Sequence, residues 1–264
     1  MSQLLSIKNL KISTNKNKID IPLVNGIDIS LNKGEILGIV GESGSGKSIS
    51  MKALLNILPE NVHASYDSYL YEGNDATNKV LPLSVIFQDP MTSLNPVRTI
   101  KYHMSEVIKR QDKSLSKEAI NNEIIKYLEL VGINNPTQRM NQYPFELSGG
   151  MMQRIMIAMA LLAKPQVLIA DEPTTALDVT IQAQILKLIK TLQKENNLSV
   201  ILVTHDFGVV ASMCDHVIVM KDGDIVERGS VKEIFTHPKQ DYTKSLLRAA
   251  DLNKEGQSYV KTTD

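Results

Sequence analysis

The chain has 264 residues, a length that suits one large α/β domain or a domain with a subdomain. Its 29 Lys and Arg residues balance 29 Asp and Glu residues, and this zero net charge argues against broad electrostatic binding of nucleic acid. The single cysteine, Cys214, cannot form an internal disulfide, which fits a reducing compartment. The densest apolar run, Ile155 to Ala163, is about half of the ~20 residues that a membrane-spanning helix requires, so we expect a chain that does not cross a bilayer by itself.

The first part of the chain predicts strands, then a glycine-rich turn and a helix. Alternating apolar residues over 5–12 and 27–31 are typical of antiparallel strands with one wet face. Residues 36–40 form a short continuous apolar run, which suits a strand buried on both faces. After the glycine-rich turn, a helix is expected over 48–58, where Pro59 stops it.

The middle of the chain predicts three helices. Apolar residues recur at helical spacing in two stretches, and Gly132 is placed to end the second of these helices. A third helix is expected from about Gly149 to Leu162. We therefore interpret residues 91–160 as a mostly helical subdomain inserted between strands. The apolar residues of the first two helices are Ile100, Met104, Val107 and Ile108, then Ile120, Ile124, Tyr127, Leu128 and Val131.

After this insert, strands and helices alternate again. Apolar runs at 167–170, 200–203 and 217–220 predict buried strands, and the spacing over 181–192 predicts an amphipathic helix. The tetrapeptide Ser230-Val-Lys-Glu233 has the form of a capping box, which starts a helix.

These elements predict an α/β fold in which a parallel-sheet core carries an antiparallel β flank and an inserted α-helical subdomain. We treat residues 1–264 as a single domain. Residues 1–90 and 161–264 would form the core with its flank, and residues 91–160 the helical insert.

The glycine-rich turn matches G-x-x-x-x-G-K-[ST], the P-loop pattern. Glycines let the backbone wrap around phosphates, and the backbone N–H groups with the following helix N-terminus supply positive potential. The alternative is a glycine-rich connecting turn, but the predicted strand before it and helix after it favour a P-loop NTPase fold. Lys47 would reach the β- and γ-phosphates, and the Ser48 hydroxyl would bind Mg²⁺. The predicted phosphate-binding residues are Gly41, Glu42, Ser43, Gly44, Ser45, Gly46, Lys47 and Ser48.

Four further features follow the P-loop in a set order. They are Gln88 in a Phe-Gln-Asp-Pro run, Leu147-Ser-Gly-Gly150, Asp171-Glu172 after an apolar strand, and His205 after another. This order resembles the nucleotide-binding subunits of ABC transporters, and the resemblance covers nearly the whole chain. Leu-Ser-Gly-Gly is that family's own motif and is far more specific than the P-loop.

Longer stretches narrow the resemblance to the dipeptide, oligopeptide and nickel importer group. They are Phe87–Pro96, Ser148–Met151, Asp171–Asp178, Val226–Gly229 and His237–Tyr242, the last of which resembles a short His-Pro-containing motif of that group. Peptide members often continue much further and sometimes carry a cysteine cluster. The shorter tail here favours nickel or another metal complex slightly over di- and oligopeptides, and both remain open.

The resemblance implies the catalytic and metal-binding residues. Asp171 would bind Mg²⁺, and Glu172 beside it would be the general base for the attacking water. Gln88 would contact the metal or the water and sense the γ-phosphate. His205 would donate a hydrogen bond to the γ-phosphate and support the transition state.

The resemblance also implies a shared site. Ser148, Gly149 and Gly150, at a helix N-terminus, would bind the γ-phosphate of an ATP held by the opposite subunit. Asp178 would lie at the subunit junction.

Each of these residues has a structural alternative. An acidic residue after a strand is often only a helix cap, which is the alternative for Asp171 and Glu172. Asp178 could simply be the N-cap of the next helix. A single Gln on a loop is usually just solvated, so Gln88 depends on its surrounding motif. The remaining histidines that we interpret as structural are His63, His103 and His216.

The implied assembly is a sandwich of two ATPases with ATP and Mg²⁺ as cofactors. Its partners would be a second ABC ATPase, identical or related, two membrane permease subunits and, indirectly, an extracytoplasmic solute-binding protein. The chain would be peripheral, at the cytoplasmic face of the cell membrane, with Met91–Pro96 as the link to the permease. Thr14 stands where many members place an aromatic residue against adenine, so base stacking is in question.

The alternative function is a soluble ABC ATPase that acts on DNA or ribosomes. Such proteins usually carry a long coiled-coil insertion or two tandem cassettes. This sequence has one cassette and no such insertion, and its neutral charge points the same way. We therefore expect no nucleic-acid partner.

Overall fold

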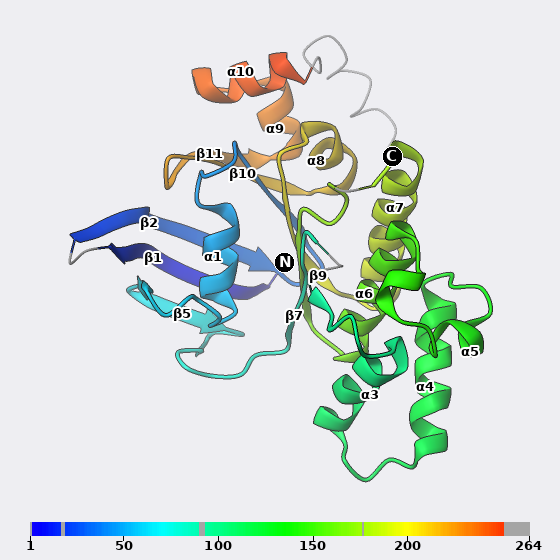
Figure 1. Ribbon diagram of the computed structural model, residues 1–264. Helices are drawn as coiled ribbons and strands as arrows, with labels where there is room; N and C mark the ends of the chain where they lie inside the picture. The colour runs from blue at the N-terminus through cyan, green and yellow to red at the C-terminus, as the bar shows by residue number, and fades with distance from the viewer. Residues whose placement is uncertain (1, 17–18, 90–92, 176, 251–264) are drawn as a thin grey trace. The chain divides into compact units, whose positions relative to one another are not determined.

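The computed structural model describes residues 2–16, 19–89, 93–175 and 177–250 of the chain (Figure 1). The chain divides into two compact units, Met1–Leu81 with Asn197–Asp264, and Pro82–Asn196. Each unit combines strands with helices, as the α/β prediction requires. The subdomain boundaries at residues 90 and 160 stay a prediction.

The first unit contains an antiparallel sheet built on two long strands, β1 (Gln3–Lys16) and β2 (Ile19–Asn32). Ile27, Ile29 and Leu31 of β2 are at most 3% exposed, whereas the side chains between them are partly or fully exposed. This alternation confirms the predicted strands with one wet face. Three short strands complete the sheet, namely β4 (Val62–Ser65), β5 (Ser68–Tyr71) and β6 (Asn74–Asp75).

The same unit contains a second, mostly parallel set of strands in the order β11-β10-β3-β9. All residues of β3 and β9 are buried, which confirms the interpretation of continuous apolar runs as strands covered on both faces. Val40 at the end of β3 is paired with Thr204 at the end of β9, so the loops after both strands begin at one edge of the sheet. The strands are β3 (Ile36–Val40), β9 (Ser199–Thr204), β10 (His216–Lys221) and β11 (Asp224–Ser230).

Helix α1 (Lys47–Leu54) is shorter than the expected helix over 48–58. Asn56 adopts a left-handed backbone with φ of 55°, and its N–H donates to the Ala53 carbonyl. The Ile57 N–H donates to the Lys52 carbonyl at 3.0 Å. These two bonds form a Schellman cap, which ends the helix several residues before Pro59.

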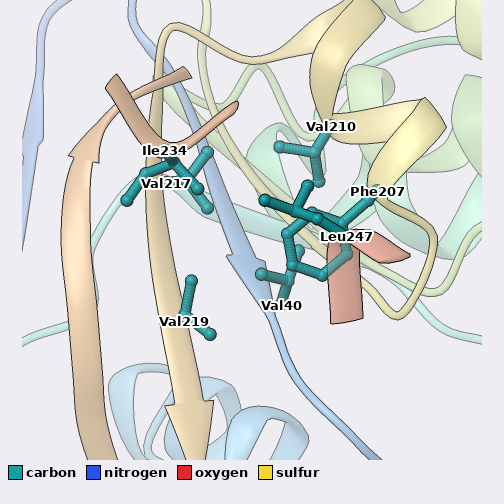
Figure 2. Packing of buried hydrophobic residues seen from close by; sticks show 7 residues of the cluster. All are labelled: Val40, Phe207, Val210, Val217, Val219, Ile234 and Leu247. Carbon is teal, nitrogen blue, oxygen red and sulfur yellow. The ribbon is translucent and has the colours of Figure 1, made fainter. Parts of the chain in front are cut away.

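Three further helices of the first unit contribute to a core shared with the parallel strands, α8 (Phe207–Met213), α9 (Val231–Thr236) and α10 (Asp241–Ala249). The predicted capping box starts α9, because Ser230 and Glu233 exchange side chain to backbone hydrogen bonds. Figure 2 shows the buried cluster that these helices share with β3 and β10. Its members are Val40, Phe207, Val210, Val217, Val219, Ile234 and Leu247.

The second unit pairs two parallel strands, β7 (Leu83–Ile86) and β8 (Val167–Asp171), and carries the helices of the middle of the chain (green in Figure 1). Helix α6 begins at Gly149 and ends at Leu162, as predicted, and packs against α3 and α4. Gly132 follows α4 with φ of 76°, which confirms its place at the helix end. The helices are α3 (Ile100–Gln111), α4 (Lys117–Leu130), α5 (Pro136–Arg139), η1 (Pro144–Glu146), α6 (Gly149–Leu162) and α7 (Val179–Glu195).

The apolar run that starts at Ile155 belongs to α6, and most of that helix is buried. In the part of the chain that the structure describes, every helix is too short or too polar to cross a membrane.

Candidate functional site

The P-loop lies between β3 and α1 in the first unit, as the pattern predicts. Its three glycines all have positive φ, 153° at Gly41, 84° at Gly44 and 99° at Gly46. A Cβ on Gly41 would lie 2.1 Å from the Met220 carbonyl oxygen, so this position has no room for a side chain. The loop therefore requires glycine both for its backbone angles and for its close contact with β10.

We expect Gly41→Ala to disrupt this loop. The added methyl group would collide with the Met220 backbone, and such overpacking together with backbone strain should lower the free energy of unfolding by about 3 kcal/mol and abolish nucleotide binding. Gly44→Ala is the matched control, because a Cβ there meets nothing within 4 Å and only the backbone penalty of about 1 kcal/mol remains. Thermal unfolding and ATP titration of both variants check this prediction. Equal effects of the two substitutions would contradict it.

Lys47 is the buried cation of the loop. The side chain is 5% exposed, and its Nζ donates hydrogen bonds to the Gly41 carbonyl at 2.8 Å and the Glu42 carbonyl at 2.7 Å. The ammonium group is thus held inside the curve of the loop at the N-terminus of α1. A cation and a helix N-terminus at one place form a strong anion-binding element.

His205 follows β9 at the same sheet edge as the P-loop, since Val40 and Thr204 are paired. Thr204 and Asp206 fix the turn, because Thr204 Oγ1 accepts the Asp206 N–H at 3.0 Å and Asp206 Oδ1 accepts the Gly208 N–H at 2.7 Å. The His205 side chain is exposed. The first unit thus carries two of the predicted elements, the P-loop and His205, on neighbouring strands.

The second unit carries the predicted carboxylates. Asp171 is the last residue of β8, and Glu172 follows it with a left-handed backbone at φ of 47°. The Gln88 amide, just after β7, donates to Glu172 Oε2 at 3.0 Å, and the Thr175 hydroxyl donates to the same oxygen at 2.9 Å. Because β7 and β8 are paired and parallel, their carboxyl ends bring Gln88 to Glu172. These two neutral donors fix the orientation of the Glu172 carboxylate.

The oxygen atoms of the predicted metal ligands suit a hard cation. In the second unit these are the carboxylate of Asp171 and the amide oxygen of Gln88, and in the first unit the hydroxyl of Ser48. Mg²⁺ typically takes one or two carboxylates together with phosphate oxygens and waters. Among the described residues, there is no cluster of three or more His, Cys, Asp or Glu side chains that could hold a metal alone. The residues present therefore fit Mg²⁺ that arrives with a phosphate ligand.

The Leu147-Ser-Gly-Gly150 motif forms the start of α6. Ser148 is the N-cap, and its Oγ accepts the Met151 N–H at 3.4 Å. Ser148 and Gly149 are exposed, so the motif is open to a ligand. A Cβ on Gly150 would lie 2.8 Å from Ile181 Cγ2, which explains the glycine by the close packing of α6 on α7.

Asp178 is the N-cap of α7, as its structural alternative predicted. Its Oδ1 accepts the Ile181 N–H at 3.0 Å. The side chain is exposed, and its place at a subunit junction stays a prediction.

Two further predictions concern adenine stacking at Thr14 and the link to the permease. Thr14 in β1 exchanges hydrogen bonds with Asn61, since its hydroxyl donates to the Asn61 carbonyl at 3.1 Å. In the predicted link Met91–Pro96, Met91 and Thr92 lie outside the described residues, and Leu94 is buried.

Sequence reasoning missed two contacts of the site residues. Thr175 lies within the motif Asp171–Asp178, and only that motif signals its bond to Glu172. Tyr242 lies within the motif His237–Tyr242, and its hydroxyl accepts a hydrogen bond from the backbone of Glu42 in the P-loop.

Known proteins resemble this chain over most of its length. The family profile described as ABC transporter matches residues 24–175. The oligopeptide transport ATP-binding protein OppD of Bacillus subtilis is 48% identical over 94% of this chain and 72% of its own length. The dipeptide transport ATP-binding protein DppD of Haemophilus influenzae is 44% identical over 98% of this chain and 81% of its own length.

Solved structures give the same answer for the fold. CbiO1 of Clostridium perfringens, part of the ABC transporter complex CbiONQ, superposes with a TM-score of 0.75 at 26% identity, over 97% of this chain and 98% of that one. The ATP-binding cassette MJ0796, solved as a dimer bound to ADP and phosphate, superposes with a TM-score of 0.73 at 25% identity, over 86% of this chain and 99% of that one. The predicted fold class is thus confirmed. The chain belongs to the ABC transporter family, as one of its ATP-binding subunits that hydrolyse ATP.

Proposed function

We propose that this chain is the ATPase subunit of an importer for dipeptides or oligopeptides. The observation that carries the proposal is the Leu147-Ser-Gly-Gly150 turn, which is exposed at the N-terminus of α6. A turn of this kind, open on its phosphate-binding side, can act on a nucleotide that another subunit holds. The 48% identity to OppD supports the peptide class.

The phosphate-binding residues would be those of the loop 41–48. Lys47 would exchange its bonds to the Gly41 and Glu42 carbonyls for bonds to the β- and γ-phosphates. Mg²⁺, when bound, would be held by Ser48 and Asp171. Its positive charge would offset the negative charge of the phosphates.

Glu172 would act as the general base. Its carboxylate would take a proton from water as the water oxygen bonds to the γ-phosphorus and the bond to the bridging oxygen breaks, which yields ADP and phosphate. Gln88 and Thr175 orient the carboxylate through the hydrogen bonds to its Oε2. His205, exposed after β9, would donate a hydrogen bond to the γ-phosphate as negative charge develops.

Two such subunits would enclose two ATP molecules. Ser148, Gly149 and Gly150 of one subunit would bind the γ-phosphate on the P-loop of the other, with Asp178 near the junction. MJ0796 was solved as a dimer, which supports this arrangement. ATP binding would then join the subunits and hydrolysis would release them.

The remaining partners would be two membrane permeases and, indirectly, an extracytoplasmic solute-binding protein, with this chain peripheral at the cytoplasmic face. The sequence motifs left nickel and other metal complexes open beside peptides. The relatives named above carry oligopeptide and dipeptide names, so we propose peptides as the solute.

The experiment compares two N-cap serines in the transporter assembled with its permeases in proteoliposomes. Ser148→Ala and Ser116→Ala each remove a cap that accepts one backbone N–H, at a similar cost of about 1 kcal/mol. We expect Ser148→Ala to lower ATP hydrolysis at least ~10-fold, because it also removes a γ-phosphate ligand. Ser116→Ala should hydrolyse ATP at the normal rate.

The same proteoliposomes test whether the transported solute is a peptide or a metal ion. With the binding protein present, di- and oligopeptides should stimulate hydrolysis several-fold, whereas Ni²⁺ should not. Equal rates for the two serine variants would refute the sandwich, and stimulation by Ni²⁺ alone would refute the peptide assignment.

A further inference from the structure

A hydrogen bond connects the P-loop to helix α10. The N–H of Glu42, the second residue of the loop, donates to the Tyr242 hydroxyl of α10 at 3.3 Å. The two residues are 200 positions apart in sequence and belong to the same unit. Burial is the main cause that raises the pKa of Tyr242, so this hydroxyl stays neutral around physiological pH.

The hairpin of β10 and β11 contacts the loop at two more points. The Gly223 N–H donates to the Ser45 carbonyl at 3.2 Å, and the Met220 carbonyl lies against Gly41. Lys221 of the same hairpin places its Nζ 4.9 Å from the centre of the Tyr242 ring, which is the distance of a cation–π contact. The hairpin and Tyr242 thus support each other as well as the loop.

Helix α10 is anchored firmly enough to act as a support. Leu247 of α10 is 1% exposed and packs in the same cluster as Val40, the residue just before the P-loop (Figure 2). At the other end of the helix, the Glu227 carboxylate accepts the Lys239 N–H at 2.7 Å and the Gln240 N–H at 3.1 Å. Both ends of the segment are therefore fixed to β-strands.

We infer that Tyr242 is a positioning residue for nucleotide binding, which holds the first turn of the loop 41–48 in the shape that receives phosphates. This inference rests on the proposed role of that loop. A loop with three glycines loses much conformational freedom when it orders, and a tether present before binding removes part of that cost. The C-terminal segment then contributes to nucleotide affinity without contact with the nucleotide.

Tyr242→Phe tests the inference on the purified full-length chain, because it deletes the hydroxyl and keeps the ring that packs beside Lys221. We expect the Kd for ATP to rise about 3- to 10-fold, as for the loss of one modest hydrogen bond. In the assembled transporter, KM for ATP should rise while kcat stays unchanged. The effect should be the same from pH 6.5 to 8.5, since the hydroxyl does not ionise there. Tyr127→Phe, on α4 of the other unit, is the matched control and should bind ATP normally.

Amide hydrogen exchange distinguishes a local effect of Tyr242 on the P-loop from a general loss of stability. The Glu42 amide should exchange faster in Tyr242→Phe without nucleotide, while the unfolding temperature changes little. By linkage, ATP should slow exchange in residues 241–249 of the unaltered chain and less so in Tyr242→Phe.

An unchanged Kd, or a weaker Kd that tracks a lower unfolding temperature, would overturn the inference. Lys47→Ala keeps this result distinct from the fate of the proposed function. If Lys47→Ala fails to bind ATP and Tyr242→Phe binds it normally, only the tether is refuted. If Lys47→Ala binds ATP normally, the loop assignment itself is refuted.

Discussion

Glu172→Gln should bind ATP normally and hydrolyse it ~10²- to 10⁴-fold more slowly, which is the usual loss when a general base is removed. The substitution keeps the size of the side chain and leaves an oxygen that can accept from Gln88 and Thr175. The amide cannot take a proton from water at neutral pH. Binding and turnover should therefore separate, with Kd unchanged and kcat reduced.

The measurement is single-turnover hydrolysis in the assembled transporter, next to ATP titration of the same preparation. Glu129→Gln is the matched control, because it removes an exposed carboxylate of α4 in the same unit. It should hydrolyse ATP at the normal rate. Near-normal turnover in Glu172→Gln would remove this residue from the role of base.

The backbone at Glu172 also marks the site. Its φ of 47° is uncommon for a residue with a Cβ, and such angles cluster where the surroundings hold a residue for function. At Glu172 this backbone angle occurs together with hydrogen bonds from Gln88 and Thr175 to the carboxylate. The motif predicted that Glu172 follows a strand end, but it predicted neither the backbone angle nor these two contacts.

The long elements could be predicted because their patterns are local. The apolar runs of β3, β8 and β9 and the helical spacing of α4 identify these elements without any knowledge of the neighbours. The strands between Val62 and Ile86 were not placed, since each has four residues or fewer and lies among turn residues. The end of α1 was misplaced because Pro59 is a strong stop signal, whereas Asn56 in a left-handed cap is a weaker one.

The motifs name candidate residues and not the contacts between them. Gln88 and Glu172 were predicted separately as site residues, and the parallel pairing of β7 with β8 explains why they meet. The contact between Glu42 and Tyr242 spans 200 positions, and no local pattern encodes a pairing at that distance. Long-range contacts of this kind depend on how the strands between them are ordered, which a single sequence does not state.

Lys47→Ala should weaken ATP binding by at least ~100-fold. Hydrogen bonds from a charged donor contribute roughly 1.5–3 kcal/mol each, and Lys47 would lose two or more to the phosphates. The Lys47 Nζ also donates hydrogen bonds to the Gly41 and Glu42 carbonyls, so the variant should have a looser loop as well as a missing cation. Isothermal titration with ATP and with ADP, together with thermal unfolding without nucleotide, measures both effects.

Comparing the affinities for ATP and ADP distinguishes a looser loop from a lost contact to the γ-phosphate. A looser loop would weaken ATP and ADP alike, whereas a missing contact to the γ-phosphate would weaken ATP more. Lys52→Ala, on the last turn of the same helix, removes a positive charge away from the loop and should leave both affinities unchanged. ATP affinity that is the same in Lys47→Ala as in the unaltered chain would contradict the phosphate site, because no other lysine of the chain lies within the loop 41–48.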